Sequence, residues 1–186
     1  MITLSVRQPW SYLLCKGIKP IENRSLKLPE KYKGKRVLIH ASSQPWPWYK
    51  TLYYIQSLAN SKEILDILQD IKFNGESLRN LPTSAIVGSV VFTDCVINHP
   101  SIWAEKTKIN CSHPLKCGSW STDSCTEGCV HHCGFIKPIY NWVCEDPILF
   151  DKPVLNVKGK LNFWDYNPET LPPQLIDYVL DEKGIV

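Results

Sequence analysis

The chain lacks a long apolar run, and its first residues, MITLSVRQPW, lack the basic and then apolar pattern of a secretion signal. We therefore expect a cytoplasmic protein with no membrane partner. The chain also lacks an internal repeat, so a repeat array is not expected. With 186 residues, of which 44% are hydrophobic, it is long enough for one domain with its own core.

A strong net charge is also absent, because acidic and basic residues nearly balance at +3. The average hides an uneven distribution. Residues 16–36 hold eight basic and two acidic residues, a net charge of +6, whereas residues 165–186 carry a net charge of −4. A local basic segment is a typical electrostatic footprint for phosphate groups, and a solvated lysine-rich loop explains the same residues equally well.

Paired CxxC motifs are missing, although the chain has eight cysteines. Cys15, Cys95 and Cys144 stand alone in apolar surroundings and are expected to be small buried side chains. The other five cluster with three histidines, and without a secretion signal this composition favours a metal site over disulfides. The candidate zinc ligands, of which a closed site needs four, are Cys111, Cys117, Cys125, Cys129, Cys133, His113, His131 and His132. A structural zinc ion and a loop without metal both remain open.

Short strands and short helices alternate along the chain without a repeating strand–helix–strand period. This pattern predicts an α+β fold built on a small mixed barrel rather than a doubly wound parallel sheet. Strands are expected over residues 2–7, 20–25, 35–42, 81–97, 140–146, 147–154 and 158–166. Helices are expected over residues 9–17, 46–59, 61–72 and 167–182.

Proline and glycine predict where some of these elements begin, end or bend. Pro9 suits the first helical position, and Gly17 suits the residue after the last turn, where a positive φ is favoured. Gly88 is expected to mark a bulge or a close approach within a long strand. Pro20 favours an extended segment directly after the first helix.

Ordered sequence blocks resemble those of the ASCH domain, a branch of the PUA-like superfamily. GIKPIENR, residues 17–24, fits the motif GxKxxExR, and LSVRQPW, VLIHAS, AIVGSVVFTDCV, YNWV and KGKLNFWDY match further blocks in family order. The resemblance implies a PUA-like mixed β-barrel with flanking short helices. It places an ASCH domain at residues 1–168, with a Cys/His-rich insertion at 99–134, and leaves an acidic helix or tail at 169–186.

The resemblance implies a function related to RNA or nucleotides. It leaves open a module that binds RNA, a nucleobase or a nucleotide, and a small metal-independent amidohydrolase acting on an acylated nucleoside such as N4-acetylcytidine. Lys19 matches the lysine of the amidohydrolases, but Glu22 stands where they have threonine, and their glutamate has no assigned counterpart. This departure favours the binding module. In an enzyme, Lys19 and Glu22 would be the catalytic residues.

The motif also predicts a site from its own geometry. In an extended segment Glu22 and Arg24 project to the same side, so they can share a ligand or form a purely structural ion pair. We expect a pocket in which Glu22 accepts hydrogen bonds from a base edge and His40 lies at the rim. The candidate ligand-binding residues are Lys19, Glu22, Arg24, Trp10, Arg7 and His40. A protein partner bound by the Cys-rich insertion is a third hypothesis.

Overall fold

A computed structural model describes residues 1–58, 72–73, 76–77, 80–107, 138–167 and 173. Its elements are β1 (Ile2–Val6), α1 (Trp10–Cys15), β2 (Ile21–Arg24), the 3₁₀ helix η1 (Glu30–Tyr32), β3 (Arg36–Ala41), α2 (Trp48–Leu58), β4 (Lys72–Phe73), β5 (Glu76–Ser77), β6 (Ala85–Ile97), β7 (Tyr140–Val154) and β8 (Phe163–Asp165). Within these residues, no helix is long and apolar enough to cross a membrane. The helices predicted over 61–72 and 167–182 fall almost entirely outside them.

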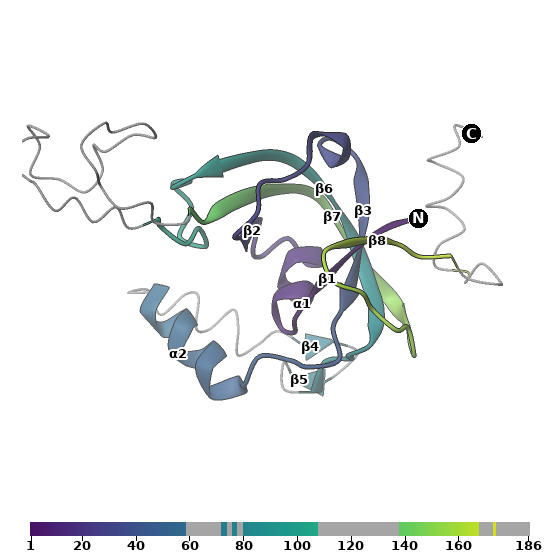
Figure 1. The fold of residues 1–186 in the computed structure, drawn as a ribbon. Helices are drawn as coiled ribbons and strands as arrows, with labels where there is room; N and C mark the ends of the chain where they lie inside the picture. Colours follow the sequence, from purple (N-terminus) through teal and green to yellow (C-terminus); the bar gives the residue numbers. More distant parts are fainter. Residues whose placement is uncertain (59–71, 74–75, 78–79, 108–137, 168–172, 174–186) are drawn as a thin grey trace, which may run out of the picture.

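Six strands form one mixed sheet in the order β2-β7-β6-β3-β1-β8, which curls into a half-barrel (Figure 1). β1 and β3 pair in parallel, whereas the other paired strands of this sheet are antiparallel. A parallel pair needs a connection that returns the chain to the starting end, and here α1, β2 and η1 make that connection. The curled sheet and its few short helices confirm the predicted α+β class.

Helix α1 lies inside the curve of the sheet and packs on β3, β6 and β7 (Figure 1). All six of its residues are buried, including Trp10, Leu13 and Leu14. A helix this short is marginal in isolation, so its stability comes from this packing.

Gly88 on β6 marks a close approach, as predicted. A Cβ atom at this position would lie 2.1 Å from the carbonyl oxygen of Ile148 and 2.8 Å from Cys15 Sγ. Cys15 and Cys144 are buried as expected, while Cys95 is only partly buried. Burial raises the pKa of the Cys15 and Cys144 thiols, so both stay protonated and inert at neutral pH.

The C-terminal end of α1 agrees with the prediction, whereas its N-terminal end differs by one residue. Pro9 is the N-cap and not the first helical residue, so the helix begins at Trp10. Gly17 has a φ of +78°, and its N–H donates to the carbonyl of Leu14 at 3.0 Å. This left-handed turn lies in the five-residue connection, residues 16–20, that leads the chain from α1 into β2.

The strands predicted over 140–146 and 147–154 form one continuous strand, β7. Its pairing with β6 shifts register between Ser89 and Val91, and Pro147 lies in this irregular stretch. A bulge accommodates a proline because the residue that has no N–H is removed from the regular ladder. The proline therefore bends the strand without ending it.

Candidate ligand-binding pocket

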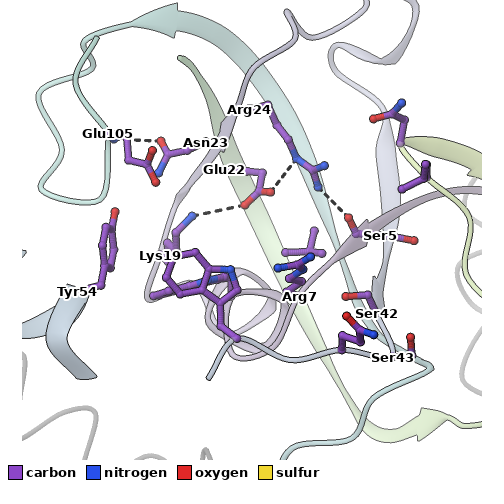
Figure 2. Close-up of a pocket in the computed structure, with 16 residues that line it drawn as sticks. Ser5, Arg7, Lys19, Glu22, Asn23, Arg24, Ser42, Ser43, Tyr54 and Glu105 are labelled. Atoms are coloured by element: carbon purple, nitrogen blue, oxygen red, sulfur yellow. Dashed lines mark hydrogen bonds and ion pairs between the residues drawn. The ribbon is translucent and has the colours of Figure 1, made fainter. Parts of the chain in front are cut away.

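A cavity of about 500 Å³ opens where β2 faces the ends of β1 and β3 (Figure 2). Its lining comes from β1, α1, β2, the loop after β3, α2, Glu105 and the residues just before β8. The volume lies within the range of about 300–1,000 Å³ that is usual for small-molecule sites. Five of the six predicted ligand-binding residues line it: Arg7, Trp10, Lys19, Glu22 and Arg24.

Glu22 is a buried carboxylate in this cavity, with 6% of its surface exposed. Its Oε1 atom accepts a hydrogen bond from Arg24 Nε at 2.9 Å, and its Oε2 atom lies 3.5 Å from Lys19 Nζ. A buried carboxylate needs such partners, since removing a charge from water is costly. The prediction that Glu22 and Arg24 project to the same side of an extended segment is confirmed.

Arg24 joins the edge strand β2 to β1 across the open side of the half-barrel. Its Nη2 atom donates to the carbonyl of Ser5 at 2.8 Å, and its guanidinium lies 5.8 Å from the ring centroid of Trp142. Because these contacts add to the ion pair with Glu22, the guanidinium is held from three directions. Arg24 therefore fixes the position of the Glu22 carboxylate in the cavity.

Lys19 lies at the bottom of the cavity with 3% of its surface exposed. Its ammonium donates to the carbonyl of Ile21, faces Glu22, and lies 5.9 Å from the ring centroid of Trp10. A lysine has three N–H donors, so the two described partners leave one for a ligand.

Aromatic side chains from two elements form one wall of the cavity. Trp10 and Trp46 have ring centroids 5.6 Å apart, and Tyr54 lies 5.3 Å from Trp10, both in edge-to-face contact. Burial, followed by the negative charges of Glu105 and Glu22, raises the pKa of Tyr54 to about 12. The phenol is therefore protonated at neutral pH and can donate a hydrogen bond to a ligand.

Asn23 brings Glu105 to the edge of the cavity. Its Oδ1 atom accepts from the backbone N–H of Glu105 at 3.1 Å and from Asn141 Nδ2 at 2.9 Å, while its Nδ2 atom donates to the carbonyl of Trp103 at 2.9 Å. Asn23, a variable position of the motif, therefore holds the backbone at Glu105, which lies more than 80 positions away in the sequence.

Sequence reasoning did not identify several of the lining residues. Among them, Tyr54, Glu105 and Ser42 have no sequence feature that distinguishes them from ordinary helix and loop residues. Only Asn23, inside GIKPIENR, had a signal that could have identified it, because it lies between two predicted site residues.

His40 does not line the cavity, so its predicted place at the rim is wrong. The side chain is buried on the other face of β3, with 2% exposure. Its Nδ1 atom lies 3.2 Å from Ser5 Oγ, its Nε2 atom lies 2.9 Å from the carbonyl oxygen of Val157, and its ring meets Trp164 edge to face. Neighbouring strand residues point to opposite faces, and Ile39 takes the inner one.

The basic segment over residues 16–36 is partly neutralised in space. Lys33 pairs with Asp94 at 2.8 Å, and Arg36 pairs with Asp146. Exposed lysines of this segment are Lys16, Lys27, Lys31, Lys33 and Lys35.

The predicted zinc ligands between residues 111 and 133 all lie outside the described residues. In the part of the chain that the structure describes, no group of three or more His, Cys, Asp or Glu side chains could hold a metal ion. The zinc site therefore stays a prediction.

No family model matches the chain, and no curated protein matches its sequence. Among solved structures, the chain is similar to the crystal structure of ASCH from Zymomonas mobilis, with 9% identity, a TM-score of 0.44, and coverage of 90% of this chain and 88% of that chain. Two mutant forms of the Zymomonas mobilis protein also match with 9% identity and a TM-score of 0.43, over 97% of this chain and 96% or 94% of theirs. At these TM-scores the likenesses determine neither ligand nor activity.

The described residues therefore form one curled mixed sheet with few short helices, and residues of the GxKxxExR motif line its pocket.

Proposed function

We propose that the chain is an ASCH-type module that binds RNA or a nucleobase or nucleotide in the pocket at its GxKxxExR motif. The observation that carries the proposal is the Glu22 carboxylate, which is buried, lines the cavity and is held between Lys19 and Arg24. Such a carboxylate is a fixed hydrogen-bond acceptor beside a fixed cation. Nucleobases present amino donors next to ring or carbonyl acceptors, which is the complementary pattern.

The aromatic wall supports the same ligand class. Trp46 and Tyr54 are only partly buried, so they retain surface that a flat ring can contact. Contact between a base and an aromatic side chain contributes about 1–3 kcal/mol, and it tolerates different bases because each has a π face. Glu22 and Lys19 would then supply the hydrogen bonds that distinguish one base edge from another.

A hydrolase of acylated nucleosides is the second candidate, and the burial of Lys19 beside Glu22 in the cavity favours it. In that reaction water adds to the acyl carbon, the amide C–N bond breaks, and the amine leaves with a proton. However, Glu22 stands where the amidohydrolases have threonine. We therefore favour binding without turnover.

Calorimetric titration of ribonucleosides, ribonucleotides and short single-stranded RNA into the protein tests the proposal. We expect Glu22→Gln to weaken binding at least about tenfold, because the charged acceptor is lost. Glu145→Gln is the matched control, since Glu145 is exposed on β7 and outside the pocket, and it should bind normally. Absence of binding to every such ligand would contradict the proposal, and rapid acetate release from N4-acetylcytidine would favour the hydrolase.

A further inference from the structure

The parallel strands β1 and β3 end side by side at the rim of the pocket. Val6 pairs with Ala41 at the last position of the ladder, and the N–H of Ser42 donates to the carbonyl of Val6 at 2.9 Å. The two chains therefore leave the sheet at the same edge, with Arg7 on one and Ser42 on the other. Figure 2 shows both side chains at the cavity, below Glu22.

Arg7 differs from the other two cations that line the cavity. Lys19 and Arg24 both face the Glu22 carboxylate. Arg7 is exposed, and its guanidinium makes no hydrogen bond or ion pair with any described residue. A guanidinium is a planar fork of N–H donors that matches the oxygens of a phosphate group.

Ser42 supplies a second, independent observation. Its Oγ atom is buried and has no hydrogen-bond partner among the described residues. Buried hydroxyl groups in folded proteins normally have a partner, so a ligand oxygen at this position would satisfy it. The hydroxyl of Ser11 is also buried without a hydrogen-bond partner among the described residues, but Ser11 belongs to α1 and does not line the cavity.

The residues that follow Ser42 make this end of the cavity polar. Ser43 and Gln44 also line it and bring further hydrogen-bond donors without negative charge. The acidic lining residues are Glu22, which comes from β2 and is already paired with cations, and Glu105, which Figure 2 shows on the far side of the cavity from Arg7. A single cation, Arg7, surrounded by neutral hydrogen-bond donors is an arrangement typical of a site that binds an anion.

We propose that Arg7, Ser42, Ser43 and Gln44 form a phosphate subsite at the carboxyl ends of β1 and β3. The ligand of the pocket is then a phosphorylated nucleoside and not a free base or nucleoside. Its base lies against Glu22 and the aromatic wall, and its phosphate lies at Arg7. This inference rests on the proposed function and narrows it. The phosphate belongs either to a mononucleotide or to the backbone of RNA.

Paired ligands measure the subsite directly. We would titrate each ribonucleoside, its 5′-monophosphate and a short oligoribonucleotide containing it into the wild-type protein and into Arg7→Gln and Ser42→Ala. The monophosphate should bind at least about tenfold more tightly than its nucleoside. The ratio of the monophosphate's affinity to the nucleoside's affinity should fall toward one in Arg7→Gln. In Ser42→Ala this ratio should fall by a smaller factor. Lys152→Gln removes the same charge from an exposed position on β7 and should leave the ratio unchanged.

The outcomes separate this inference from the proposed function. Equal affinity for nucleosides and their monophosphates would overturn the subsite and leave the proposed function intact. The subsite would also be overturned if Arg7→Gln left the ratio unchanged. If no ligand bound, the proposed function and the subsite would both be wrong. With the ratio present, tighter binding of the oligoribonucleotide would identify RNA as the source of the phosphate, and tighter binding of the monophosphate would identify a free nucleotide.

Discussion

At the scale of single residues, the pocket depends on how three buried charges share their partners. Glu22 is paired with Lys19 on one oxygen and with Arg24 on the other, so the cluster carries one net positive charge. Removing any member leaves a buried charge less well compensated, which costs stability as well as affinity. A useful test therefore measures both quantities on the same variant.

Lys19→Met removes the ammonium and keeps an apolar side chain of similar length against Trp10. In a binding module, this change should weaken ligand binding at least about tenfold, because a charged hydrogen bond to the ligand is lost. It should lower the free energy of unfolding by about 1 kcal/mol, since Arg24 still pairs with Glu22. Calorimetric titration and thermal unfolding measure the two effects.

Lys16→Met is the control, because Lys16 is exposed at the C-cap of α1 and its replacement should change neither quantity. Full ligand affinity in Lys19→Met, with no acetate release by the wild-type protein, would assign Lys19 a structural role alone. Retained affinity together with lost acetate release would identify Lys19 as a catalytic residue of a hydrolase.

At the scale of elements, side chains from β1 and β3 hold the segment before β8 by hydrogen bonds. The carbonyl of Val157 lies 2.9 Å from His40 Nε2, and the carbonyl of Lys160 accepts a hydrogen bond from Ser5 Oγ at 2.7 Å. Gly159 packs directly on the imidazole, where a Cβ atom would lie 2.2 Å from His40 Cε1. His40 therefore acts from behind the pocket, through a segment that continues into two lining residues, Leu161 and Asn162.

This fastening should make stability depend on pH. Burial lowers the pKa of His40 below its ordinary value of 6.5, and the hydrogen bond to Val157 offsets only part of that effect. Below pH 6.5 the unfolded chain therefore binds more protons at this site than the folded chain, so the free energy of unfolding falls as the pH falls. Denaturant unfolding at about pH 7.5 and about pH 5 should show this loss.

His40→Gln isolates the effect, because glutamine can still meet the Val157 carbonyl but does not titrate. Its free energy of unfolding should fall less between the two pH values than that of the wild-type protein. An equal fall in both proteins would show that other groups cause the pH dependence.

At the scale of the whole molecule, the basic segment should contribute to RNA binding through the phosphate backbone. Lys31, Lys33 and Lys35 are exposed. Changing all three to alanine should weaken binding at low salt and reduce the slope of log affinity against log salt by up to about 2, because fewer counterions are released. The salt bridge from Lys33 to Asp94 will reduce the share of that lysine.

Changing Lys50, Lys106 and Lys152 to alanine removes the same charge from exposed positions outside the segment. That variant should keep more of the wild-type slope. An unchanged slope in the first variant would show that residues 31–35 do not contact the RNA backbone.

A second prediction at this scale concerns zinc binding by the Cys/His-rich insertion. We expect about one zinc ion per chain, held by four of the candidate ligands between residues 111 and 133 and without a catalytic role. Elemental analysis of protein purified without chelators measures the metal content. Metal-free protein whose residues 111–133 exchange their amide hydrogens rapidly would rule the site out.

The sequence by itself determined the features that depend on neighbouring residues. Gly17 ends α1 because glycine adopts positive φ at little cost, and the extended segment after it places Glu22 and Arg24 on one side. The order of strands and helices also followed from local patterns, which is why the α+β class and much of the pocket could be predicted.

Only the tertiary structure decided which distant residues complete the pocket and which face His40 takes. Tyr54 on α2 and Glu105 after β6 line the same cavity as Glu22 although they lie far from it in the sequence, and no local pattern encodes that proximity. Residues 37–41 are all buried, so β3 has no polar alternation from which its inner face could be read. When both faces of a strand are covered, the sequence identifies the strand, and the packing of the neighbouring elements decides which side chains meet a ligand.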